Sequence, residues 1–71
     1  MNMIPVKSSN IASIGYDENT NTLRVSFLNG SLYDYHSVPE SLYNGLMNAA
    51  SHGGYLDAYI KKGGYQYTKR R

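Results

Sequence analysis

The sequence predicts one small α+β domain, in which a three-stranded antiparallel meander packs against two short helices. Apolar and polar residues alternate strictly over 22–27, an Asn-Gly pair follows at 29–30, and apolar residues recur every four positions between 42 and 50. A period of two is typical of a strand with one buried face, whereas the longer period indicates an amphipathic helix. A chain of 71 residues fits a single domain.

The first strand is predicted over 11–16, with Ala12, Ile14 and Tyr16 on one side. The segment before it is expected to be extended because Pro5 excludes a helix interior, and Val6 is a candidate start for a short edge strand. The run Asp-Glu-Asn-Thr-Asn at 17–21 has the composition of a turn. It is short enough to join neighbouring antiparallel strands.

The sequence allows two alternative registers for the hairpin formed by strands 22–27 and 31–36. A two-residue loop at Asn29-Gly30 would expose Tyr33 and Tyr35 beside Arg24 as a stacking platform. A three-residue loop over 28–30 instead puts Gly30 in the left-handed position of a bulged turn. Its cross-strand pairs are Leu23–Tyr35, Arg24–Asp34 and Val25–Tyr33. Because these pairs match aromatic with aliphatic residues and opposite charges with each other, we predict the second register, with both tyrosines facing the core and their hydroxyls at its rim.

A first helix is predicted over 38–50. Ser37 and Glu40 have the spacing of a capping box, and Pro39 suits a first helical turn. The apolar stripe consists of Leu42, Leu46 and Ala50, flanked by Tyr43 and Met47. The glycines at 53–54 are expected to end this helix.

A second helix is predicted over 54–61, ended by the glycine pair at 63–64. Lys61 and Lys62 fall in its last turn, where cations interact favourably with the helix dipole. Residues 65–67 are expected to be extended and are candidates for pairing with a sheet edge. The ends at 1–3 and 70–71 are expected to fray, so that 4–69 form the domain.

Composition limits the environment and the core. The absence of cysteine excludes disulfides and thiolate metal sites and fits a reducing cytoplasm. The polar N-terminus contains no signal peptide or membrane span, so we expect a cytoplasmic protein with no membrane partner. A core this small supplies only about 3–5 kcal/mol of net stability, which leaves a homodimer open.

Catalysis has one candidate cluster in the sequence. Arg24, Asp34 and His36 would lie together on one sheet face, where general acid–base chemistry or hydrolysis could use them. We favour a surface ion pair beside an exposed histidine, because such pairs are common. Two histidines and scattered acids have no metal-ligand spacing. The prediction is therefore a protein without enzymatic activity, cofactor or metal.

The C-terminal stretch gives the best functional signal. Five of the seven basic residues lie in the last eleven positions, which contain no acid and hold two tyrosines. Cations can neutralise phosphates while tyrosines stack on bases, which predicts binding to single-stranded RNA or tRNA. The candidate residues are Lys61, Lys62, Tyr65, Tyr67, Lys69, Arg70 and Arg71. The alternative is a solvated basic tail with both tyrosines packed back on the sheet.

Several short motifs occur together in a fixed order along the chain. They are Ser8-Ser9, Ile14-Gly15-Tyr16-Asp17, Leu23-x-Val25-x-Phe27, Asn29-Gly30, Tyr33-x-Tyr35, Val38-Pro39, Tyr43-x-x-Leu46, Ala50-Ser51-x-Gly53 and Tyr59-Ile60-Lys61. Their order and spacing over 4–69 resemble the KTSC domain, a module at the C-terminus of some lysyl-tRNA synthetases that also occurs as small free-standing bacterial and phage proteins. The resemblance implies an RNA-binding role without assigned catalytic residues. It also makes Gly30, Tyr33 and Tyr35 a structural family motif.

Two other functions remain open from the sequence. A free-standing domain rich in tyrosine suits a protein-interaction module, such as a phage-type adaptor or inhibitor of a host protein, because tyrosine and arginine anchor such interfaces. A small oligomer that binds a nucleotide or another small anion at a subunit junction is the weaker alternative.

Overall fold

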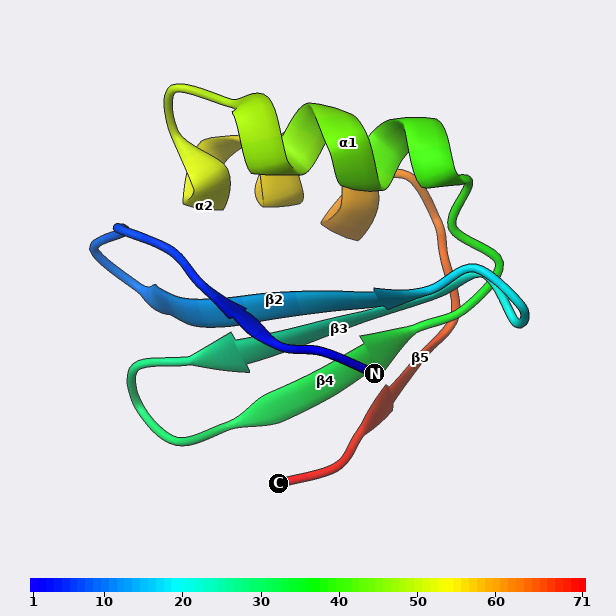
Figure 1. Ribbon diagram of the computed structural model, residues 1–71, viewed down its shortest axis with the longest axis horizontal. Helices are drawn as coiled ribbons and strands as arrows, with labels where there is room; N and C mark the ends of the chain where they lie inside the picture. The colour runs from blue at the N-terminus through cyan, green and yellow to red at the C-terminus, as the bar shows by residue number, and fades with distance from the viewer.

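The computed structural model describes residues 1–71 and contains one antiparallel sheet with the strand order β1-β2-β3-β4-β5, covered on one face by helical segments (Figure 1). The elements are β1 Ile4–Pro5, β2 Ile11–Asp17, β3 Thr22–Phe27, β4 Leu32–Tyr35, α1 Glu40–Asn48, α2 His52–Tyr55, the π-helical segment η1 Leu56–Lys61, and β5 Tyr67–Lys69. The α+β class is confirmed, but the sheet has five strands and not three. β1 and β5 span two and three residues, too few for a strand to show its alternation.

The central hairpin has the predicted register. Leu23 pairs with Tyr35, Arg24 with Asp34, and Val25 with Tyr33. Phe27 N–H donates to Ser31 O over 2.9 Å, which closes a three-residue loop. Gly30 has φ +93°, the left-handed conformation that glycine adopts without a steric penalty.

Strand β2 contains an irregularity that changes which residues face the core. The register with β3 shifts between Ile11 and Ser13, so that Ile11 and Ile14 are both fully buried while Ala12 is only half-buried. The prediction grouped Ala12 with Ile14 and Tyr16 on one side of the strand and left out Ile11, which the structure buries completely. A bulge adds one residue to the strand and breaks the simple alternation on which that prediction relied.

Helix α1 begins later than predicted and without the capping box. Ser37 has φ +58°, and Pro39 is the N-cap residue without a side-chain hydrogen bond. Val38 is fully buried, and its N–H donates to Asn21 O over 2.9 Å. Tyr16 Oη donates to the Val38 carbonyl. These tertiary contacts hold Val38 outside the helix, so the local capping pattern is not used.

The second helical segment begins where the first was predicted to end. Ser51 is its N-cap residue, and Ser51 Oγ accepts a hydrogen bond from Gly54 N over 3.1 Å. Gly53 and Gly54 therefore open a helix, contrary to the prediction that they close one. A Cβ at Gly53 would lie 2.6 Å from Asn10 Oδ1, so any larger residue there would displace the Asn10 side chain. The predicted end is confirmed, with Gly64 at φ +81°.

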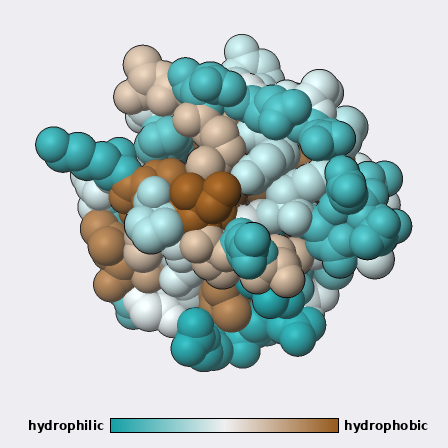
Figure 2. Space-filling model, viewed as in Figure 1, coloured by the Kyte–Doolittle hydropathy of each residue, from teal (hydrophilic) through white to brown (hydrophobic).

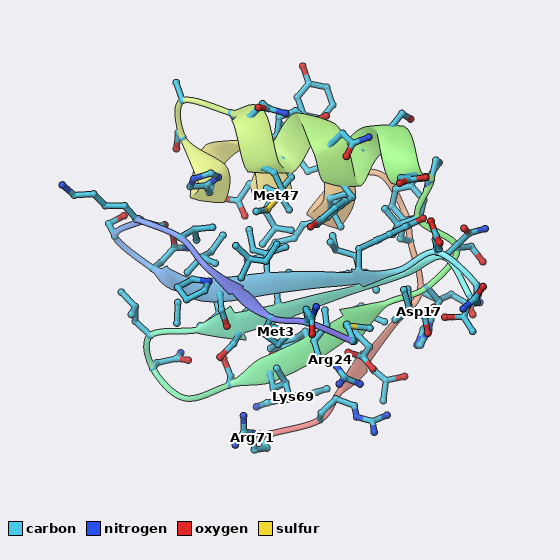
Figure 3. The ribbon with its side chains drawn as sticks, in the orientation of Figure 1. Met3, Asp17, Arg24, Met47, Lys69 and Arg71 are labelled. Carbon is cyan, nitrogen blue, oxygen red and sulfur yellow. The ribbon has the colours of Figure 1, made fainter.

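The core lies between the sheet and the helices. Its nine buried apolar residues are Ile11, Ile14, Leu23, Val25, Tyr35, Val38, Leu46, Leu56 and Ile60. Met47 packs against them from α1, between the helix and the sheet (Figure 3). The face shown in Figure 2 is mostly hydrophilic, with a small group of apolar residues near its centre. No helix is both long enough and apolar enough to cross a membrane.

Candidate nucleic-acid interface

The C-terminal stretch lies along the sheet as its edge strand. Tyr67 pairs with Tyr35 and Lys69 with Tyr33 in the β4–β5 ladder, which places the end of the chain beside β4 (Figure 1). The expected pairing with a sheet edge is confirmed for Tyr67. Backbone hydrogen bonding to β4 continues beyond the strand. Arg70 N and Arg71 N both donate to Leu32 O, and Leu32 N donates to Arg71 O. Backbone hydrogen bonds therefore connect the last two residues to the start of β4.

This strand divides the predicted RNA-binding residues between the two faces of the sheet. Residues paired across a ladder share a face, so Tyr67 and Lys69 lie on the helix side with Tyr35 and Tyr33. Arg70 instead reaches Asp34 on the other face, with 3.7 Å between Nη1 and Oδ2.

Other predicted residues lie apart from this cluster. Lys62 is the exposed C-cap residue of η1 and does not line the hollow described below. Arg71 lies at the exposed chain end (Figure 3). The seven predicted residues thus do not form one continuous surface.

The tyrosines of β4 and β5 form an aromatic cluster. The ring centroid of Tyr33 lies 6.1 Å from that of Tyr35, 5.7 Å from that of Tyr67 and 5.7 Å from that of Phe27. Tyr35 is 4% exposed, whereas Tyr67 is 62% exposed. A buried ring and an exposed ring therefore lie side by side, with Tyr33 half-buried beside both.

The cluster opens onto a hollow of about 700 Å³ on the helix side of the sheet, called the aromatic groove below. Its aromatic lining consists of Phe27, Tyr33, Tyr35, Tyr65 and Tyr67. Lys61 lines it from the end of η1, with Nζ 5.4 Å from the Phe27 ring centroid and 3.3 Å from Asp57 Oδ1. A hollow with apolar walls and a few polar groups is the usual form of a binding site.

The Tyr35 hydroxyl is the most perturbed group of the groove. Burial, with smaller contributions from the neighbouring Tyr33, Tyr67 and Asp57, raises the pKa of Tyr35 to about 12. The hydroxyl therefore stays protonated at neutral pH and can donate a hydrogen bond. It has no hydrogen-bond partner within the protein, and it is not sealed from solvent.

The second predicted cluster lies on the opposite face of the sheet. Arg24 Nε donates to Asp34 Oδ1 over 2.7 Å and Nη2 to Oδ2 over 2.9 Å. The hydrogen bond from Arg24 holds the pKa of the buried Asp34 carboxyl below its usual range. His36 Nε2 lies 2.8 Å from Thr68 Oγ1. These bonds connect β3 with β4, and the end of β4 with β5, so the cluster joins neighbouring strands.

The structure brings together residues that sequence reasoning had treated separately. The sequence predicts a structural role for Tyr33 and Tyr35 and names Phe27 only within a strand motif, yet all three line the groove with Tyr65 and Tyr67. The cross-strand register already places Phe27, Tyr33 and Tyr35 on one face of the hairpin, but no sequence pattern shows that this face is left partly uncovered. No group of three histidine, aspartate or glutamate side chains could hold a metal ion.

The fold and the groove define a small α+β module that presents aromatic side chains beside an edge strand. The chain belongs to the KTSC domain family, whose model matches residues 7–67. The resemblance inferred from the motifs is thereby confirmed.

Relatives occur both as small proteins and as parts of large ones. An uncharacterized protein from Stutzerimonas stutzeri is 34% identical over 69 residues, covering 97% of each chain. A lysine–tRNA ligase from Nostoc punctiforme is 36% identical over 59 residues, which are 83% of this chain but only 10% of the ligase. The crystal structure of a KTSC domain protein from Yersinia pestis has a TM-score of 0.89 at 38% identity, covering 99% of this chain and 97% of that one.

Proposed function

We propose that this protein is a non-enzymatic module that binds RNA through the aromatic groove. The observation that carries the proposal is the cluster of Tyr33, Tyr35 and Tyr67 at the groove, with Lys61 on its wall. Each base stacked on an aromatic side chain contributes about 1–3 kcal/mol, and single strands leave their bases free to stack. A similar segment in a lysine–tRNA ligase supports RNA as the ligand class, with tRNA among the candidates.

The positions of the basic side chains limit how much charge contributes to RNA affinity. Lys61 lines the groove and Lys69 shares the face of Tyr33, so these two are suited to contact phosphates. Arg70 is paired with Asp34 on the other face. Two phosphate contacts on a single strand give a slope of about −1.4 for the logarithm of affinity against the logarithm of salt concentration. We therefore expect stacking to contribute more than charge.

Fluorescence anisotropy with labelled tRNA and an unstructured RNA octamer tests this function. Measurements at ~50 and ~200 mM salt with wild type, Lys61→Gln and Lys7→Gln separate the groove from general charge. Lys7 is an exposed cation outside the groove, so it is a matched control. We expect Lys61→Gln to weaken binding and reduce the slope by about 0.7, with Lys7→Gln close to wild type. No binding of either RNA at the lower salt concentration would overturn the proposal.

A protein-interaction module is the second candidate. Leu28 and Tyr67 are 61% and 62% exposed, and both line the groove, where they could anchor a partner protein. Pull-down of one dominant protein, unchanged by nuclease treatment and lost in Leu28→Asp, would favour this function over RNA binding.

A further inference from the structure

We infer that the aromatic groove accepts one unpaired uracil base and leaves the phosphates outside. This inference rests on the proposed RNA-binding function and specifies its ligand. The groove's volume of about 700 Å³ lies within the usual range for small-ligand sites, about 300–1,000 Å³. A single base with its ribose fits that range, whereas a duplex does not.

The floor of the groove offers a hydrogen-bond donor. Tyr35 is 4% exposed and has no hydrogen-bond partner within the protein. Tyr35 lines the groove, and its hydroxyl is not sealed from solvent. An unpartnered donor on an apolar floor selects a ligand with an acceptor at that place, because a mismatched ligand would leave the donor unpaired.

The rim offers two further donors. Asn10 Oδ1 accepts from Ser8 Oγ over 3.0 Å, and Asn29 Oδ1 accepts from Ser31 N over 3.0 Å and from Ser31 Oγ over 2.7 Å. These bonds occupy both amide oxygens and fix the orientation of both amides. The NH2 groups of Asn10 and Asn29, which both line the groove, make no hydrogen bond within the protein.

Donors on the floor and the rim call for a base with several acceptors. Uracil carries two carbonyl oxygens and no exocyclic amino group, whereas adenine, cytosine and guanine each carry an amino group that can place a donor against a donor of the groove. The exposed Tyr67 ring is available to stack on the face of such a base. Uracil therefore fits the groove better than adenine, cytosine or guanine.

The charges of the groove favour a base over a phosphate. Lys61 is the cation that lines it, and this ammonium group already lies 3.3 Å from Asp57 Oδ1. The Asp57 carboxylate is also among the smaller causes of the raised pKa of Tyr35, so a negative charge lies near the groove. An anion inside the groove would be repelled by Asp57, and Lys61, which already pairs with Asp57, is the one cation that could offset this repulsion. The phosphates are thus expected outside, towards Lys61 and Lys69.

Binding of labelled U8 and A8 at one salt concentration tests the inference, because the two octamers have equal charge. We expect wild type to bind U8 about 10-fold more tightly than A8. Tyr35→Phe keeps the ring and removes the hydroxyl, so it should weaken U8 binding about 5-fold and leave A8 binding unchanged. Tyr59→Phe removes an exposed hydroxyl outside the groove and should leave the ratio at its wild-type value.

Asn29→Asp provides a second variant at the rim. The carboxylate can still accept both hydrogen bonds from Ser31 but replaces the free donor with an acceptor, so the ratio of U8 to A8 affinity should fall. Equal wild-type affinities for U8 and A8, or a ratio unchanged in both Tyr35→Phe and Asn29→Asp, would overturn the uracil assignment and leave RNA binding standing. Failure to bind either octamer or tRNA would overturn the proposed function as well.

Discussion

Tyr67 lies directly opposite Tyr35 in the β4–β5 ladder, with 6.0 Å between the two ring centroids. The last strand of the fold thereby places an exposed ring beside the most buried ring of the groove. An edge strand of three residues contributes little to the core, and its three residues are all exposed. Its main structural effect is to add the Tyr67 ring to the lining of the aromatic groove.

Asp34→Asn should lower the free energy of unfolding by about 2 kcal/mol at pH 7, because it removes a bidentate ion pair from a buried carboxylate. Urea unfolding measures this change. Asp57→Asn is the matched control, since its pair with Lys61 is exposed and should contribute at most about 0.5 kcal/mol. Equal effects of the two substitutions would contradict the structural role of Asp34.

The stability provided by Asp34 should depend on pH in one direction. Arg24 lowers the pKa of Asp34 in the folded protein, so the stabilisation is fully present above the unfolded value of 3.8 and is lost as the pH falls through the folded pKa. The difference in unfolding free energy between wild type and Asp34→Asn should therefore become smaller below pH 3.8. A difference that stays constant down to the acid limit of folding would argue against this linkage.

Alkaline pH should destabilise the protein through Tyr35. Its pKa is raised from 10.0 to about 12 in the folded state, so its contribution is complete below pH 10.0 and is lost as the pH rises towards 12. Tyr35→Phe removes this group and should flatten the decline in unfolding free energy above pH 10.0. Chemical unfolding of both proteins on the alkaline side measures the effect. Parallel curves would show that other groups cause the decline.

Gly45→Ala should destabilise the protein by about 1–3 kcal/mol, although alanine favours helices by about 1 kcal/mol. A Cβ at Gly45 would overlap the Tyr55 hydroxyl and lie 2.7 Å from Tyr55 Cζ, so α1 could not keep its contact with α2. Thermal unfolding of this variant and of Asn44→Ala, at the neighbouring exposed position, separates packing from propensity. Stabilisation by both substitutions would show that Tyr55 moves aside readily.

Local patterns were sufficient for the centre of the fold. The Asn29-Gly30 turn and the alternation over 22–27 led to the correct hairpin register, because turn chemistry and cross-strand pairing agreed. Val38 was placed wrongly because its contacts with Asn21 and Tyr16, distant in sequence, outweigh a local capping pattern. The edge strands were too short to show a period.

The candidate site depends even more on tertiary structure. The basic and aromatic residues of the C-terminal stretch were recognised as a group, but β5 sends Tyr67 and Arg70 to opposite faces. The groove exists because the helices cover only part of the aromatic face of the hairpin. No local pattern gives the extent of that cover, so the joint position of Phe27, Tyr33 and Tyr65 could not be predicted.

The most direct test of the central claim compares Tyr67→Leu with Tyr59→Leu in binding to U8. Both tyrosines are exposed, by 62% and 55%, but only Tyr67 lines the groove. If the groove binds RNA, Tyr67→Leu should lose about 1–3 kcal/mol of binding free energy, or about 5- to 150-fold in affinity, while Tyr59→Leu should match wild type. Equal affinities of wild type and Tyr67→Leu, with both variants folded, would contradict RNA binding in the aromatic groove.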